Sequence, residues 1–272
     1  MTTRCSYVDT PDGQLHLRMA GLRTKAPPVV LLHQTASHSV MFEGVMEFLG
    51  SRYWCVAPDT PGYGNTPHPR GTGSIALYAR VLRAALDALG IQRCWLFGHH
   101  TGASIAVQMA TDDPTFAVRL ALSGPPCLNR EQIETLIPKA APKRLEEDGS
   151  HFMAVWNRIR AKAPTADVAL LHREAVSNLQ VGPRYLEAYR AVFAQDFEGQ
   201  LADLDVETLV MAGPDDTLRD SLEPAHEALQ QGYLLELPRG GTYVCDTHPE
   251  LIAGALSDFF TPSPVQRKQR AS

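Results

Sequence analysis

Five consecutive residues, Gly98-His99-His100-Thr101-Gly102, constrain the fold more than any other segment of the chain. They follow the apolar run 93–97 and precede a segment, 103–110, with helical character. Paired glycines at this spacing mark a sharp turn from a strand into a helix, where the backbone and neighbouring strands come too close for a β-carbon. The segment therefore predicts a turn that holds the side chain of its central residue, His100, over a sheet.

Strands and helices alternate through the first half of the chain. Apolar or alternating runs predict strands at 14–19, 28–33, 53–58 and 118–123. Apolar residues recur at helical spacing over 75–89, and Gly90 suits the end of that helix. The runs at 28–33 and 53–58 are continuously apolar, which is typical of strands buried on both faces. This alternation predicts a mostly parallel, twisted sheet with helices on both faces.

The pattern changes after Gly124, because the residues from about 128 to 200 contain no buried-strand run. They predict helices at 130–137, 150–162, 166–180 and 183–194. Strands return at 208–212 and 233–237, and a last helix is expected over 249–260. We therefore expect an α/β core in two parts, 1–127 and 201–262, a helical cap inserted at 128–200, and a disordered tail at 263–272.

Composition excludes several classes of function. The chain has 272 residues, of which 44% are hydrophobic, and a formal net charge of −5. Without a face-length run of Lys or Arg, a nucleic-acid partner is not expected. No apolar stretch is long enough to span a bilayer, and the N-terminus lacks the apolar segment of a signal peptide. The five cysteines are scattered, so we expect a cytoplasmic protein without disulfides or a metal site.

Five motifs in one order resemble the α/β-hydrolase superfamily, in particular its capped members, from about residue 6 to 262. They are the strand end Leu31-Leu32-His33-Gln34, the loop Asp59–Thr66, the turn Gly98–Gly102, the strand and turn Leu209–Asp216, and the helix start Pro249-Glu250. Each motif is weak alone, but their order and spacing together are specific. The resemblance implies an α/β-hydrolase fold with an inserted helical cap, and a hydrolase that needs no cofactor.

The resemblance also implies roles for particular residues, with departures from the family pattern. His100 stands where the family has its nucleophilic Ser, and Asp216 stands where it has the triad carboxylate, with Asp215 as the alternative. Thr242 occupies the place of the catalytic His, seven residues before Pro249. His248 or His226 would serve instead if this register were wrong. Gln34 replaces a glycine of the oxyanion motif.

The chemistry of His100 follows from the space that Thr242 leaves. An imidazole at position 100 could fill that space and donate a ring N–H to Asp216, with its other nitrogen facing the substrate. Such a ring can act as a general base or acid, or as a direct nucleophile. The backbone N–H groups of Thr35 and Thr101 are expected to bind an oxyanion, because the loss of a Ser side chain does not remove them.

Three functions remain open on the sequence alone. The first is hydrolysis of an ester, lactone or similar bond in a small, mostly apolar carbonyl compound, by water that His100 activates. The second is lyase or isomerase chemistry with His100 as the proton shuttle, and the third is a small-molecule-binding protein without turnover. The partner is expected to be a small-molecule substrate, with a homo-oligomer possible and no membrane partner.

The sequence also suggests roles for residues outside the proposed His100–Asp216 pair. Substrate contacts are expected from His33, Gln34, His151 and Trp156. His99 is expected to be a packing residue of the turn, and His172-Arg173 is expected to lie on a solvated face of the cap.

Overall fold

The computed structural model describes residues 2–138 and 144–261. Its centre is an eight-stranded sheet with the strand order β1-β2-β4-β3-β5-β6-β7-β8. The strands are β1 (Arg4–Thr10), β2 (Gly13–Ala20), β3 (Val29–Leu32), β4 (Cys55–Pro58), β5 (Cys94–His99), β6 (Ala117–Ser123), β7 (Thr208–Ala212) and β8 (Gly232–Glu236). The strand β2 runs antiparallel to both of its neighbours, β1 and β4, and every pairing from β4 to β8 is parallel. The predicted mostly parallel sheet is confirmed.

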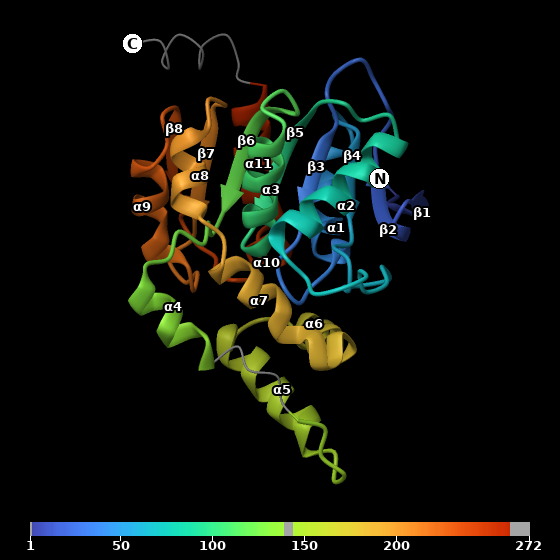
Figure 1. Ribbon diagram of the computed structural model, residues 1–272, viewed down its shortest axis with the longest axis vertical. Coiled ribbons are helices and arrows are strands. Elements are labelled where there is room, and N and C mark those ends of the chain that lie inside the picture. Colours follow the sequence, from blue (N-terminus) through green and yellow to red (C-terminus); the bar gives the residue numbers. More distant parts are fainter. Residues whose placement is uncertain (1, 139–143, 262–272) are drawn as a thin grey trace.

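Helices cover both faces of the sheet, as the apolar runs predict (Figure 1). One face carries α1 (Glu43–Leu49), α10 (Val244–Thr247) and α11 (Pro249–Phe260), whose apolar residues form a cluster with β3, β4 and β5. The other face carries α2 (Ile75–Ala88), α3 (Thr101–Asp112), α8 (Phe197–Asp203) and α9 (Leu222–Glu227). Because β3, β5 and β6 are enclosed on both faces, the turns at their carboxyl ends rest on a well-packed frame.

Four helices between β6 and β7 gather beyond one end of the sheet (Figure 1). They are α4 (Arg130–Leu136), α5 (Ser150–Lys162), α6 (Val168–Val181) and α7 (Tyr185–Phe193), close to the predicted ranges. Side chains of α5 and α6 form a small apolar cluster of their own with Tyr243, which belongs to the loop after β8. Through Tyr243, this group of helices lies against the carboxyl-end loops of the sheet.

Some features differ from the sequence-based expectations. The β1 strand was not predicted, because its residues are exposed or half-buried and its apolar pattern is weak. The expected boundary at residue 200 falls inside α8, whose buried Phe197 and Leu201 belong to the core cluster of α2 and α3. We therefore place α8 with the core. The tail expected to be disordered, 263–272, lies outside the described residues. Among the residues that the structure describes, no helix has the length and apolar character needed to cross a membrane.

Candidate active site

The turn between β5 and α3 has the geometry that the paired glycines predict. His100 has φ +50° and ψ −112°, and it is the one non-glycine residue with positive φ in the described chain. A β-carbon on Gly98 would lie 2.3 Å from the Gly102 carbonyl oxygen, and one on Gly102 would lie 2.0 Å from the Leu32 carbonyl oxygen. The positive φ of His100 costs about 1–3 kcal/mol, and a strained backbone of this kind persists where the surrounding structure holds it. The surrounding strands thus fix the position of the His100 side chain.

His100 and Asp216 form the predicted pair. The Nε2 atom of His100 lies 2.9 Å from Oδ1 and 3.0 Å from Oδ2 of Asp216. The Asp216 side chain is fully excluded from solvent, and its Oδ1 also accepts a 2.8 Å hydrogen bond from the Leu218 N–H. Burial alone would raise the pKa of Asp216, but His100, His99 and the Leu218 amide hold that pKa well below its usual range. Asp216 is therefore a carboxylate that orients the ring of His100.

The orientation of the ring assigns a role to each nitrogen. A β-carbon on Gly124 would lie 2.4 Å from Cδ2 and 2.5 Å from Nε2 of His100, so this edge of the ring packs against a residue without a side chain. Since a carboxylate only accepts, Nε2 carries the proton that is donated to Asp216. The neutral ring then keeps its lone pair on Nδ1. Nδ1 is thus the atom of His100 that can take a proton.

The structure places the other residues considered for a triad in different surroundings. Asp215, the alternative carboxylate, is exposed, whereas Asp216 is buried. The Thr242 hydroxyl lies 3.3 Å from the Thr217 hydroxyl, next to Asp216 in the chain. His248 contacts Thr247, and His226 contacts the Gly232 carbonyl, so each bonds within its own segment. Neither ring replaces a catalytic His at position 242.

His99 is more than the packing residue that the sequence suggests. Its ring is fully buried, with Nδ1 3.0 Å from the Ser123 hydroxyl and Nε2 2.9 Å from the Thr242 carbonyl oxygen. Burial first, and then the neighbouring His100, lower the pKa of His99 to about 3. His99 therefore stays neutral and ties the ends of β5 and β6 to the loop that carries Thr242.

His99, His100 and Asp216 also place potential metal-ligand atoms within 4.8 Å of one another. Both ring nitrogens of His99 already have partners, however. To ligate a metal, His99 would have to release Ser123 or Thr242. This donor set fits a hydrogen-bonded brace better than a metal centre.

The expected oxyanion groups lie together beside the turn. The Thr35 N–H points to the Thr101 hydroxyl at 3.4 Å, which joins the loop after β3 to the first residue of α3. As that first residue, Thr101 has an amide N–H without a partner inside the helix. The 3.4 Å contact is long for a hydrogen bond, so an oxyanion could compete for the Thr35 N–H.

His33 and Gln34 support this loop from within. The Nδ1–H of His33 donates to the Gln34 carbonyl oxygen at 2.9 Å, and Nε2 accepts from the Thr60 N–H at 2.8 Å. Both side chains are buried. Because both ring nitrogens of His33 are occupied, the expected substrate contact from this ring gives way to a bracing role.

A second buried network lies behind the same loop, around Asp59. Its carboxylate accepts hydrogen bonds from the His16 ring and from the amides of Ser39 and Asn65. His38 Nδ1 is buried without a hydrogen-bond partner and lies 4.0 Å from Asp59 Oδ1. Burial lowers the pKa of His38 to about 4. The hydrogen bonds of Asp59 hold this part of the chain together, and His38 stays neutral beside them.

The cap contacts the same loop through a charged cluster that the sequence analysis missed. Glu174 on α6 is buried and accepts a 2.9 Å hydrogen bond from the Ser37 hydroxyl. Arg173 binds Glu174 at 2.7 Å and Asp246 on α10 at 2.8 Å. Burial raises the pKa of Asp246 to about 6, against the opposing effect of Arg173. Arg173 is therefore not the solvated residue that was expected, although the adjacent His172 is exposed.

The signal for this cluster was present in the sequence. Glu174 shares a helical face with Leu171, Ala175 and Asn178, all of which are buried. An acidic residue on the apolar face of a helix has to find a partner when it is buried. Ser37, which donates to Glu174, and Asp246, which binds Arg173, are distant in sequence, so the pattern alone could not name them.

The two expected cap contacts differ in position. Trp156 is partly buried and packs against the cluster formed by α5, α6 and Tyr243. Because Tyr243 directly follows Thr242 in the chain, this packing supports a place for Trp156 near the site. His151 lies at the start of α5, where Nδ1 accepts from the Glu146 N–H at 3.1 Å and the ring contacts Phe152. Within the described chain, His151 is thus occupied with its own helix start.

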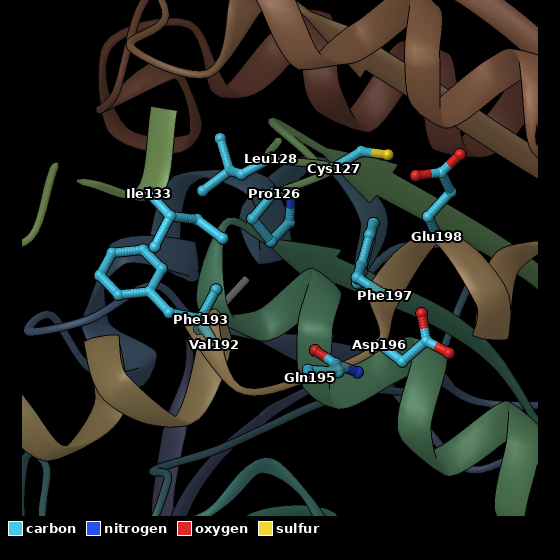
Figure 2. A pocket seen from close by; sticks show the side chains of 10 residues that line it. All are labelled: Pro126, Cys127, Leu128, Ile133, Val192, Phe193, Gln195, Asp196, Phe197 and Glu198. Atoms are coloured by element: carbon cyan, nitrogen blue, oxygen red, sulfur yellow. The ribbon is translucent and has the colours of Figure 1, made fainter. Parts of the chain in front are cut away.

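A small hollow of about 130 Å³ lies where the cap joins the core (Figure 2). Ile133 and Phe193 lie at one side of it, and Cys127 and Glu198 at the other. Burial raises the pKa of Cys127 to about 11, so its thiol stays protonated and is a weak nucleophile. The hollow therefore offers no activated thiol, and the His100–Asp216 pair remains the candidate centre.

Comparisons with known proteins agree with this geometry. The family model for the alpha/beta hydrolase fold matches residues 27–249. RutD of Klebsiella pneumoniae, provisionally named as a carbamate hydrolase, is 30% identical over 239 residues, covering 82% of this chain and 87% of that protein. Haloalkane dehalogenase 2 of Mycobacterium tuberculosis is 25% identical over an alignment of 284 residues, covering 93% of this chain and 94% of the dehalogenase.

Other matches are shorter or more distant in sequence. The chain spans 30% of the length of an uncharacterized Mycobacterium tuberculosis protein, with 35% identity over 105 residues, or 39% of this chain. The crystal structure of a hydrolase from Pseudomonas aeruginosa PA01 superposes with a TM-score of 0.79 at 22% identity, covering 95% of this chain and 98% of that one. The motif order, the sheet and the matched family model together show that the chain belongs to the α/β-hydrolase family.

Proposed function

We propose that this protein hydrolyses an ester, lactone or similar bond in a small carbonyl compound, with the His100–Asp216 pair as general base in place of a Ser triad. One observation carries the proposal: the ring of His100 lies over the sheet and donates Nε2–H to a buried carboxylate. Such a carboxylate fixes the tautomer of the ring and stabilises the imidazolium that forms when the ring takes a proton. The membership in a hydrolase family supports the same class of reaction.

The proposed reaction needs water as its second reactant. Nδ1 of His100 takes a proton from water while the water oxygen forms a bond to the substrate carbonyl carbon. The N–H groups of Thr35 and Thr101 bind the negative charge on the carbonyl oxygen. The bond to the leaving oxygen then breaks, and His100 returns its proton to that oxygen. The products are a carboxylic acid and an alcohol, or a hydroxy acid from a lactone.

The test is kinetic and uses a panel of small esters and lactones. On the best substrate, His100→Ala should lower kcat/KM by about 10²–10⁴-fold, the usual contribution of a general base. Asp216→Asn should also lower kcat/KM, because a neutral side chain cannot stabilise the imidazolium. His172→Ala is the matched control, since His172 is exposed on α6. Full activity in folded His100→Ala would refute the proposed mechanism.

A further inference from the structure

A half-buried guanidinium in the cap lacks a charged partner. Arg158 on α5 donates from Nη2 to the Asn178 side-chain oxygen at 2.8 Å, but its Nη1 is buried without any hydrogen-bond partner. Asn178 carries no charge, and no carboxylate forms an ion pair with Arg158 in the described chain. A cationic N–H group that is buried and unpaired is costly, so its presence calls for a negative partner.

A tyrosine ring lies against this guanidinium, and its hydroxyl bonds to a second tyrosine. The Arg158 Cζ atom lies 4.9 Å from the centroid of the Tyr185 ring, and the Tyr185 hydroxyl is 3.0 Å from that of Tyr189. Burial is the main cause that raises the pKa values of Tyr185 and Tyr243, whereas Arg158 acts to lower both. These hydroxyls therefore stay protonated at neutral pH and can donate hydrogen bonds to an anion.

The same part of the cap packs against the loop that carries Thr242. Tyr243 directly follows Thr242, whose carbonyl oxygen binds His99. Tyr243 also packs with Val155 and Ile159 of α5, which flank Arg158 in the chain. Arg158 therefore lies in the part of the cap that contacts the loop beside the proposed catalytic pair.

We propose that Arg158, with the hydroxyls of Tyr185 and Tyr189, binds a carboxylate of the substrate at the end opposite the scissile bond. The planar fork of Arg suits a carboxylate, and Nη1 is the donor still free to complete that fork. Only the assignment of this carboxylate to a substrate rests on the proposed function. It narrows the substrate class to compounds with one hydrolysable carbonyl group and one free acid group.

Binding can be measured without turnover. Isothermal titration calorimetry with glutarate as the probe should show saturable binding to the wild type and to the catalytically impaired His100→Ala. Arg158→Met should weaken the affinity by about 10–100-fold, the usual scale for a hydrogen bond to a charged group. Arg160→Met is the matched control, because Arg160 is exposed on the same helix and should leave the affinity unchanged. Tyr185→Phe should give a smaller loss than Arg158→Met.

Further measurements keep the result interpretable. Arg158→Lys keeps the charge but not the fork, so it should bind glutarate with an intermediate affinity even if the Met variant folds poorly. Dimethyl glutarate, which has no acid group, should bind more weakly than monomethyl glutarate. The inference is overturned if Arg158→Met and Arg160→Met lose affinity equally, if phosphate binds as tightly as glutarate, or if both methyl esters bind alike. Binding of glutarate without hydrolysis of any ester would sink the proposed function and leave the carboxylate site standing.

Discussion

A four-member cycle of His100→Ser, Thr242→His and their double variant tests the structural basis of the dyad. The Asp216 side chain is fully excluded from solvent and has two kinds of partner, the His100 ring and the Leu218 N–H. A hydrogen bond that a neutral ring donates to a buried carboxylate contributes about 1.5–3 kcal/mol. Because the Leu218 bond remains, we expect His100→Ser to lower the free energy of unfolding by about 2 kcal/mol, within that range.

The second change has its own cost and its own benefit. Thr242 is 4% exposed, so an imidazole added there beside His100 would overpack the site by about 1–3 kcal/mol. In the double variant the imidazole at position 242 gains the space that His100 vacates and can bind Asp216. The summed cost of the single variants should therefore exceed the cost of the double variant by about 2 kcal/mol or more, a coupling typical of residues in contact.

Two assays measure the cycle. Urea unfolding followed by tryptophan fluorescence gives the free energies, and hydrolysis of one p-nitrophenyl ester gives the activities. His100→Ser alone should be a poor esterase because its Ser has no base, whereas the double variant should exceed both single variants. Equal activity in His100→Ser and the double variant would show that another residue already acts as base. Additive stabilities would show that position 242 does not reach Asp216.

Three further predictions follow from the same contacts. The wild type should resist covalent labelling by fluorophosphonates, which require an activated Ser; stoichiometric labelling detected by mass spectrometry would reveal a nucleophile other than His100. Because burial lowers the pKa of His38 to about 4 and of His99 to about 3, the unfolded chain binds more protons below about pH 6.5. The free energy of unfolding should then fall as pH drops from about 6.5 to 4, by up to about 1.4 kcal/mol per pH unit for each ring. His38→Asn should make this slope shallower in urea titrations. An unchanged slope would contradict the assignment of His38 as a buried, neutral ring. Glu174→Gln should lower kcat and change KM less, because Glu174 holds Ser37 in the loop that carries Thr35. Faster hydrogen exchange of residues 33–38 should accompany the loss of activity. A change in KM alone would argue against this link.

Local patterns in the sequence were sufficient to predict the frame of the site. The turn at His100 follows from its two glycines, since their backbone contacts leave no room for a β-carbon. Asp216 was implied by the resemblance to the α/β-hydrolase superfamily, with Asp215 as the alternative, and the structure separates the two by burial. The prediction of the turn depends on the chain within a few residues of His100, which is why it could be made without the fold.

The partners of the buried polar residues could not be predicted in the same way. His99 bonds to Ser123 and Thr242, which lie 24 and 143 residues away in sequence. Arg158 lies between the buried Val155 and Ile159 in α5, but only the packed cap shows that one of its nitrogens is left without a partner. Such contacts arise from the folded topology, and periodicity carries no information about them.

The contact between His100 and Gly124 links the choice of amino acid at two positions. With φ +55°, position 124 lies in the left-handed region, where Asn would ordinarily be tolerated beside Gly. Any β-carbon there would nevertheless meet the His100 ring at 2.4 Å. A chain that carries His in this turn, with the ring directed to Asp216 as here, should therefore keep Gly directly after β6.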